Sequence, residues 1–415
     1  MKIDKKIEIE VQMQDFDDDF SAIMVLSPLH NQAFSLAQRT LESAHMLHAD
    51  SIFDGPDGRD NVLFSCFNPV RAATDKMLTG SEITSIVDSN FLSGIRRILD
   101  QPPNSLLNKE NKEILAFVIL SGLCEGAITP GMAYHEMQGN SSDKKHLLEA
   151  FNAYEFLWFE TDLDLICETL IQNRMPDWGL SDRLTRKIPR SSLTKIRSIS
   201  GGQRYYSELY ATIVAATIEL KSGSTISNNT KFKAFIEAIY RCGAFGMGSL
   251  RYFSLYFSDT PSKLGVQRKS MLKQVHSGSF EKIKRGILNA ASDCYFLSEY
   301  GSAINSFHER RTPRVFVTSD TALKKIMESE FNDRNLWQSG VSATIDRFRG
   351  EQMDPQTASM IDDAIPIFDA GQVPKKRPAM RESAKHFLAN QDQAIVDAWL
   401  KLAEVVGDAS SPTSF

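Results

Sequence analysis

The chain has 415 residues and a formal net charge of −5; 42% of its residues are hydrophobic and 24% are charged. This length is enough for two or three domains, and the balance is typical of an ordinary globular protein. The acidic balance argues against a polycation that coats nucleic acid without specificity, but it is compatible with a local basic groove.

The cysteines and the first residues of the sequence bear on the cellular compartment of the protein. The five cysteines are scattered and never form a CxxC pair, which predicts reduced thiols rather than a disulfide scaffold or a zinc site. The opening MKIDKKIEIEVQMQ is charged throughout and lacks the apolar core of a secretory signal. No stretch approaches the roughly 18 uninterrupted apolar residues of a membrane span. We therefore expect a cytoplasmic protein with no membrane partner.

Residues 1–79 are expected to form a separate N-terminal module. Apolar and polar residues alternate over 6–13, which predicts a strand, and a cluster of acids at 15–20 is expected to be a solvated turn. Residues 21–50 have a helical pattern. The stretch FDGPDGRDN at 53–61 is typical of turns.

Strands and helices alternate in the segment that follows. Residues 83–87 predict a strand, and helices are expected at about 90–99 and 109–124. The Pro-Pro pair at 102–103 separates these helices, because proline inside a helix removes a backbone donor and clashes with the preceding turn. Residues 127–139 predict a short apolar entry and then a helix.

The remainder of the chain is expected to be mostly helical. Residues 143–280 show helical patterns and no obvious strand. Strand character returns in RVFVTSD at 314–320, and a helix is expected directly after it. Residues 331–415 predict a helical C-terminal extension that ends in a disordered tail.

Four acids are candidate catalytic and metal-binding residues. Asp88 and Asp320 end apolar strands, and the carboxyl edge of a parallel sheet is where sites assemble in α/β proteins. Glu136 lies on a predicted helix, and Asp293 lies in the apolar helix ILNAASDCYFLSEYGSAI, where an acid needs a partner. Converging carboxylates suit Mg²⁺ or Mn²⁺, which support phosphodiester hydrolysis. The polar neighbours expected to orient a water or these carboxylates are Asn90, Thr318 and Asn289.

Each acid also has a structural explanation. Asp88 and Asp320 are well placed to cap the helices that follow them. Glu136, taken alone, fits a solvated position on its helix. The case for a catalytic site rests on the ordered set of acids and not on any single residue.

The segments ITSIVDSNFLSGI, AITPGMAYHEM, AASDCYFLSEYGSAI and RVFVTSDTALKKI resemble, in this order, the four acidic motifs of the PIN-domain nucleases. The resemblance covers residues 80–138 and 285–330. It implies the α/β class, as a three-layer α/β/α sandwich with a mainly parallel sheet. It also implies a Mg²⁺- or Mn²⁺-dependent endonuclease, with RNA favoured over DNA and a role in bacterial toxin or antiviral systems. The implied catalytic and metal-binding residues are Asp88, Glu136, Asp293 and Asp320.

One spacing departs from a compact member of this family. Glu136 and Asp293 are separated by a much longer segment than the other successive acids. We infer a nuclease domain over 80–330 that contains a large helical insertion at about 140–280.

The insertion carries a basic stretch, RLTRKIPRSSLTKIRSISGGQRYY, that contains no acid. In an acidic protein this stretch predicts a local positive patch for nucleic-acid phosphates. A solvated loop and a surface for an acidic protein partner are equally compatible with it. The candidate nucleic-acid-binding residues are Arg183, Arg186, Lys187, Arg190, Lys195, Arg197 and Arg204.

Two other functions remain open at this point. The first is a non-catalytic scaffold on the same fold, which binds nucleic acid or an acidic partner. The second is a phosphatase-like or receiver-like domain, which also uses strand-end aspartates and would give Asp293 no role. The sequence is compatible with binding of a regulatory protein partner and with assembly into a homo-oligomer.

Overall fold

The computed structural model describes residues 8–12, 21–25, 27–42, 47–49, 84–123, 126–140, 144–178, 202–223, 225–244, 246–257, 268–310, 314–318, 320, 322–323, 326 and 378–407. The chain divides into two compact units. Unit 1 comprises Met1–Ser200 and Ser306–Lys324, and unit 2 comprises Gly201–Asn305 and Lys325–Phe415.

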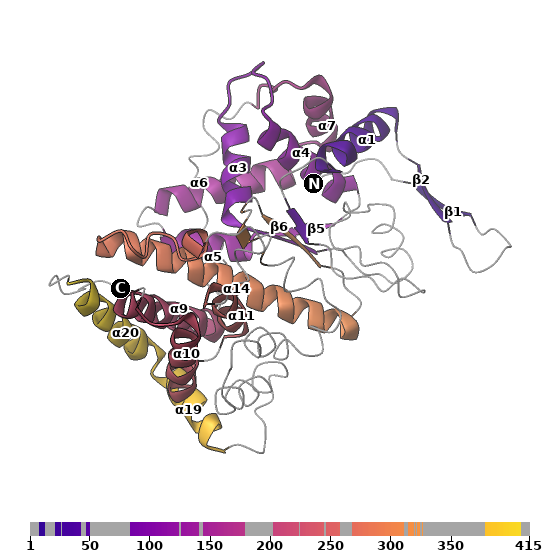
Figure 1. Cartoon of the computed structure of the whole chain (residues 1–415). Helices are drawn as coiled ribbons and strands as arrows, with labels where there is room; N and C mark the ends of the chain where they lie inside the picture. The colour runs from indigo at the N-terminus through magenta and orange to yellow at the C-terminus, as the bar shows by residue number, and fades with distance from the viewer. Residues whose placement is uncertain are drawn as a thin grey trace. The chain divides into compact units, whose positions relative to one another are not determined.

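Unit 1 contains a four-stranded sheet in the order β3-β6-β4-β5, of which β5 and β6 are labelled in Figure 1. The strands are β3 (Leu47–Ala49), β4 (Thr84–Val87), β5 (Ala127–Thr129) and β6 (Arg314–Thr318). β4 pairs in parallel with both β5 and β6, whereas β3 is antiparallel to β6. The unit is therefore of the α/β class with a mainly parallel sheet, as the sequence predicts. A separate antiparallel pair consists of β1 (Glu8–Gln12) and β2 (Ser21–Val25).

The helices of unit 1 form one hydrophobic core with the sheet. They are α1 (Pro28–Glu42), α3 (Ser89–Leu99), α4 (Lys109–Leu123), α5 (Gly131–Asn140), α6 (Lys144–Glu155), its π-helical continuation η1 (Phe156–Glu160) and α7 (Leu163–Gln172). α4 packs against α1, α3 and α7 and is buried from Glu113 to Leu123. A helix that is apolar on all sides is expected at such a central position.

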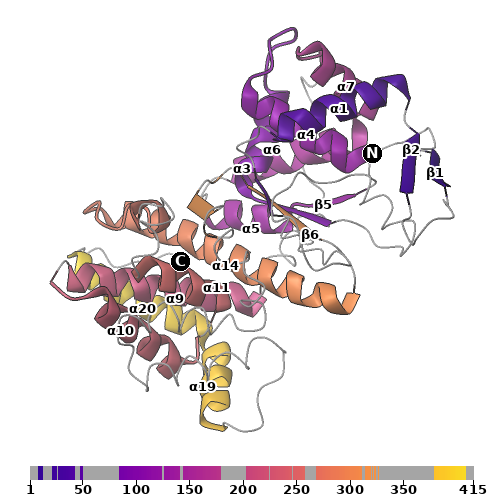
Figure 2. The same ribbon diagram turned by 45° about the vertical axis from the view of Figure 1, so that its right-hand side comes forward.

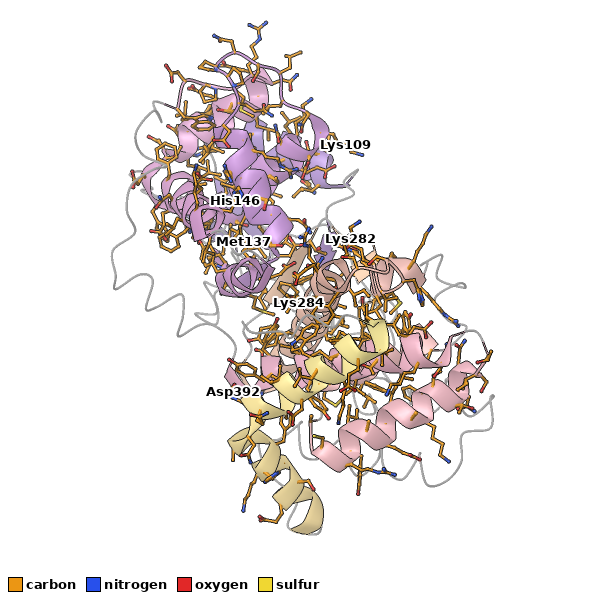
Figure 3. The ribbon with its side chains drawn as sticks, turned by 90° about the vertical axis from the view of Figure 1, so that its left-hand side faces the viewer. Lys109, Met137, His146, Lys282, Lys284 and Asp392 are labelled. Atoms are coloured by element: carbon orange, nitrogen blue, oxygen red, sulfur yellow. The ribbon has the colours of Figure 1, made fainter. Side chains whose placement is uncertain are left out.

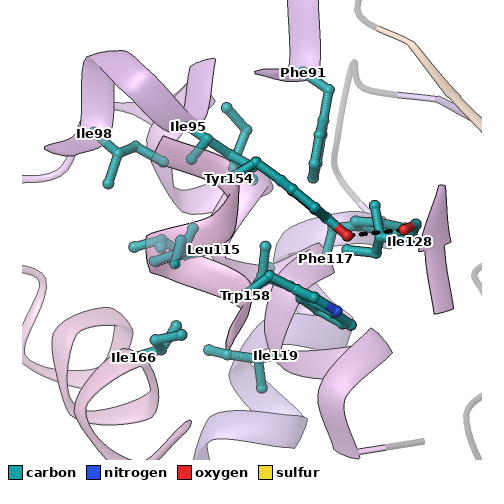
Figure 4. Packing of buried hydrophobic residues seen from close by; sticks show 14 of the residues in the cluster. Phe91, Ile95, Ile98, Leu115, Phe117, Ile119, Ile128, Tyr154, Trp158 and Ile166 are labelled. Carbon is teal, nitrogen blue, oxygen red and sulfur yellow. Dashed lines mark hydrogen bonds between the residues drawn. The ribbon is translucent and has the colours of Figure 1, made fainter. Parts of the chain in front are cut away.

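Figure 4 shows how this core meets the sheet. Phe91 of α3 packs edge-on against Phe117 of α4, with ring centroids 5.5 Å apart. The Tyr154 hydroxyl of α6 donates a hydrogen bond of 2.8 Å to the carbonyl of Ile128 in β5, and this contact is buried. The bond fixes α6 relative to the strand that precedes α5.

α3 approaches α4 closely because of a glycine. A Cβ atom added at Gly94 would lie 2.2 Å from Ile114 Cδ1. On the opposite side of α3, Arg96 forms an ion pair of 2.6 Å with Glu149 of α6. The apolar face of α3 therefore lies in the core, and its last turn is tied to α6 by charge.

The N-terminal segment differs from the expectation in two ways. The helical pattern predicted for 21–50 was wrong at both ends, where the structure has the short strands β2 and β3. Apolar runs of this length do not distinguish a strand from a helix by periodicity. The expected separate module over 1–79 also differs from the structure, since α1 packs against α4 and α7 and contributes Ala33, Ala37 and Leu41 to their core.

Unit 2 is helical in its described part. Its helices are α9 (Gly202–Ser222), α10 (Asn228–Cys242), α11 (Met247–Phe257), α13 (Arg268–Met271), α14 (Phe280–Arg310, of which 306–310 count in unit 1), α19 (Pro378–Ala389) and α20 (Gln391–Val406). α9 packs against α10, α11 and α20 (Figure 2). Near the start of α14, Lys284 Nζ lies 6.0 Å from the ring centroid of Trp399 in α20 (Figure 3).

The expected insertion does not form one body. Residues 144–178 belong to unit 1, while 202–305 belong to unit 2. The expected acidic turn, the turn at 53–61 and the C-terminal tail lie outside the described residues. Among the helices that are described, none is both long and apolar enough to cross a membrane.

Candidate active site

The sheet brings the ends of β4 and β6 together. The two strands are parallel neighbours, with Val87 opposite Val317, and the Asp88 N–H donates a hydrogen bond of 3.1 Å to the Val317 carbonyl. The residues that follow the two strands therefore lie at the same edge of the sheet. This edge is where sites assemble in parallel α/β proteins.

Asp88 is buried at this edge, with 2% of its surface exposed. It is the N-cap of α3, and its Oδ1 accepts a hydrogen bond of 2.9 Å from the Phe91 N–H. Its Oδ2 accepts from Asn90 Nδ2 at 3.1 Å and from the Thr318 hydroxyl. The capping role is therefore real, and the two polar neighbours expected from the sequence both contact this carboxylate.

Burial raises the pKa of the Asp88 carboxyl above its ordinary value. Hydrogen bonds from Thr318, Phe91 and Asn90 act in the opposite direction, and the nearby negative charge of Asp320 raises the pKa further. Within the described part of the chain, no basic side chain is among the groups that act on this carboxyl. The buried carboxylate thus faces another acid and has no compensating cation among the described residues.

Asp320 is joined to Asp88 through Thr318. The Asp320 N–H donates a hydrogen bond of 2.9 Å to Thr318 Oγ1, and this hydroxyl in turn donates to Asp88 Oδ2. Asp320 Oδ1 accepts from the N–H groups of Ala322 and Leu323 at 2.8 and 3.1 Å. Asp320 therefore caps the turn after β6, as the sequence also predicts.

Glu136 reaches the same edge from α5. Its Oε2 accepts a hydrogen bond of 3.3 Å from the Ser89 N–H, in the first turn of α3. The positive end of a helix dipole favours carboxylates at such a position. The expectation of a merely solvated side chain does not describe Glu136, which is half-buried against this helix end.

Asp293 and Asn289 lie on α14 in unit 2. Asp293 is half-buried, and its Oδ2 lies 3.4 Å from the Tyr252 hydroxyl of α11. The structure thus gathers three of the four predicted acids in unit 1 and has the fourth in unit 2.

The acids of unit 1 supply only oxygen ligands, which Mg²⁺ and Mn²⁺ prefer. Among the described residues, no three His, Cys, Asp or Glu side chains are close enough together to form a ready-made metal site. The donors fit a divalent ion by their chemistry, and to hold one ion together their side chains would have to rotate towards one another. Glu136 would leave the Ser89 N–H in such a rotation.

The basic stretch is described only at its end. Residues 183–197 lie outside the described residues, whereas Arg204 lies in the first turn of α9. Its Nη1 atom lies 3.0 Å from Glu299 Oε1 of α14. Arg204, one of the seven residues predicted to bind phosphates, therefore has an acidic partner within unit 2.

One buried acid was missed by sequence reasoning. Glu208 of α9 is fully buried and accepts hydrogen bonds from the N–H groups of Gly248 and Ser249 at 3.1 and 2.6 Å, at the start of α11. Burial raises its pKa from 4.5 to about 7, against the effect of hydrogen bonds from Ser298 and Ser249. The signal in the sequence is a single acid among apolar residues in SELYATIVAAT, together with Gly246 of AFGMG, which leaves room for its carboxyl group.

Comparison with protein-family models, curated proteins and solved structures finds no match to this chain. Its function is therefore argued from the geometry at the carboxyl edge of β4 and β6.

Proposed function

We propose that the protein is a PIN-like, Mg²⁺- or Mn²⁺-dependent endonuclease that hydrolyses phosphodiester bonds. The observation that carries the proposal is the buried Asp88 carboxylate beside Asp320, at the end of two parallel strands and without a basic partner among the described residues. Uncompensated charge of this kind costs stability, and a bound cation would remove the cost.

The strand order supports the PIN-like part of the proposal. β4, which ends in the candidate first acid, lies between β5 and β6 and is parallel to both. In the proposed α/β/α sandwich this arrangement gives one acid after the central strand, one after its neighbour and one on the helix that follows the other neighbour. Asp88, Asp320 and Glu136 occupy these three positions.

Asp88, Glu136 and Asp320 would hold the ion, and we retain Asp293 as the proposed fourth acid. When bound, Mg²⁺ or Mn²⁺ supplies a water of lowered pKa and neutralises charge on the phosphoryl group. Asn90 and Thr318 fix the orientation of the Asp88 carboxylate through Oδ2. RNA is proposed over DNA because of the motif resemblance, and so is a role in bacterial toxin or antiviral defence.

A second function has an observation in its favour. Asp88 and Asp320 both accept backbone hydrogen bonds as caps, so each has a role that needs no metal. A non-catalytic scaffold that binds nucleic acid or an acidic protein would keep the acids for this reason alone.

The two functions separate on the substitution Asp88→Asn. Asparagine is as good an N-cap as aspartate and keeps one acceptor oxygen for the Phe91 N–H, so a cap-only role predicts a folded protein with unchanged activity. Its amide would face the donors of Asn90 and Thr318, which costs some stability. The nuclease proposal predicts that Asp88→Asn and Asp320→Asn abolish Mg²⁺- or Mn²⁺-dependent cleavage of labelled RNA while the far-ultraviolet circular dichroism is unchanged.

Asp162→Asn is the matched control, because Asp162 is also an N-cap aspartate in unit 1, at the start of α7. It should cleave like the wild type. Absence of divalent-ion-dependent cleavage of RNA and DNA by the folded wild-type protein would favour the scaffold. Full activity of Asp293→Asn would remove only the fourth acid from the proposal.

A further inference from the structure

Unit 2 contains an open groove of about 390 Å³ between three helices. α9 forms its floor, and α10 and α20, which both pack against α9, form its walls. Pockets for small molecules begin at about this size. The groove is independent of the acids in unit 1.

The groove exists because its walls carry small side chains. α10 contributes Ala234 and Ala238, one helical turn apart, and α20 contributes Ala394 and Ala398 with the same spacing. Methyl groups at these positions leave space that larger residues would fill. The floor is apolar as well, since Val214 and Ile218 lie along it.

The two ends of the groove differ in charge, and helix direction shows why. α9 and α10 are antiparallel, since Tyr210 hydrogen-bonds to Cys242 while Glu219 pairs with Lys231. The Tyr210 end of the groove therefore carries the Cys242 thiol, the Tyr210 phenol and the Asp397 carboxylate, whose negative charge acts on Tyr210. Burial raises the pKa of Tyr210, which keeps this phenol neutral at physiological pH.

The opposite end carries two lysines. α20 follows Phe387, whose ring packs against Tyr210 at 5.4 Å, so α20 runs from the Tyr210 end along the floor towards Lys401. Lys401 and Lys221, in the last turn of α9, both line the groove at this end. Among the described residues neither ammonium group forms an ion pair, although Asp397, an exposed acid in the lining, lies one helical turn before Lys401 on α20.

From this distribution we propose that the groove binds a medium-chain aliphatic carboxylate. The alkyl chain would lie on Val214 and Ile218 between the alanine walls, and the carboxylate would lie between Lys221 and Lys401. A nucleotide fits less well, because Tyr210 is the single aromatic side chain among the described residues of the lining. The ligand is thus an unesterified fatty-acid anion. The groove is separate from the proposed nuclease site.

The test is isothermal titration of the full-length protein with decanoate below its micellar concentration. Saturable binding of one decanoate is expected, and decyltrimethylammonium, of the same chain length and opposite charge, should bind more weakly. Because each buried methylene contributes about a factor of four in the dissociation constant, decanoate should bind about 15-fold more tightly than octanoate. Equal binding of the cationic and anionic amphiphiles, or no saturable binding of decanoate, would overturn the proposal.

Variants locate the ligand within the groove. Lys221→Met and Lys401→Met should each weaken decanoate binding about threefold, the scale of an exposed ion pair. Ala238→Leu should fill the groove and weaken binding at least about tenfold. Ala234→Leu, at an exposed position, serves the same purpose if the Ala238 variant does not fold. Lys385→Met, outside the groove, is the control and should bind normally. Unchanged affinity in a folded leucine variant would contradict this location.

Discussion

The buried carboxyl group of Glu208 should make unit 2 more stable in mild acid than at higher pH. Its pKa in the folded protein is about 7, compared with an ordinary value of 4.5. Below the ordinary pKa both the folded and the unfolded chain carry the proton, so pH has no effect through this group. Between the two values only the folded chain retains the proton, so stability falls as the pH rises.

The size of the effect follows from the two pKa values. A difference of about 2.5 between them corresponds to about 3 kcal/mol once the folded group has ionised. Most of this, about 2–3 kcal/mol, is expected between about pH 5 and pH 8, where the unfolded group is largely ionised and the folded group loses its proton. Glu208→Gln removes the titrating proton and should remove this part of the pH dependence.

Hydrogen exchange of the α11 amides measures the effect where it arises. The opening free energy of these amides, after correction for intrinsic exchange rates, should fall by about 2–3 kcal/mol more in the wild type than in Glu208→Gln over this pH range. Glu281→Gln, at an exposed position on α14, is the control and should behave like the wild type. The same pH dependence in wild type and Glu208→Gln would refute the reasoning.

Three further substitutions test other contacts. Tyr154→Phe removes the buried hydrogen bond to β5, leaves its carbonyl unpaired and should lower the free energy of unfolding of unit 1 by about 1–3 kcal/mol, measured by denaturant titration. Gly248→Ala would place a methyl carbon 1.6 Å from a backbone oxygen of α14, so it should lower the melting temperature far more than a typical surface substitution; an unchanged melting temperature would contradict the close packing. Thr318→Val removes the hydroxyl that donates to Asp88 while keeping the shape of the side chain. It should reduce the affinity for Mg²⁺ or Mn²⁺ about 10–100-fold in a calorimetric titration. Unchanged affinity would show that this hydrogen bond does not orient Asp88 for ion binding.

The elements at the site could be predicted because their local signals are strong. β4 ends in a polar residue after an apolar run, and α3 and α4 are separated by the Pro-Pro pair. The proximity of Asp88, Thr318 and Asp320 followed from the parallel arrangement of the strands that carry them. The hydrogen bond between Glu136 and the Ser89 N–H depends on a side-chain rotamer and on the packing of α5, which no local pattern encodes.

Long-range packing accounts for what the sequence did not predict. The contact of α1 with α4 and α7 joins segments far apart in the chain, and periodicity reports only which face of each helix is apolar. For the same reason the sequence pattern places Asp293 in order with the other acids but does not reveal that its helix begins in a different unit. The strand β2, SAIMV, is an apolar run without polar alternation, and β3 has only three residues, so neither shows the period of a half-buried strand.

The most direct test of the central claim is the rate of RNA cleavage by the full-length protein with Mn²⁺ or Mg²⁺, compared between wild type, Asp88→Asn and Asp162→Asn. We expect cleavage by the wild type that stops on chelation of the ion, a rate at least about 100-fold lower for Asp88→Asn, and a normal rate for Asp162→Asn. Equal rates for wild type and Asp88→Asn would show that Asp88 is a helix cap and not part of a catalytic site.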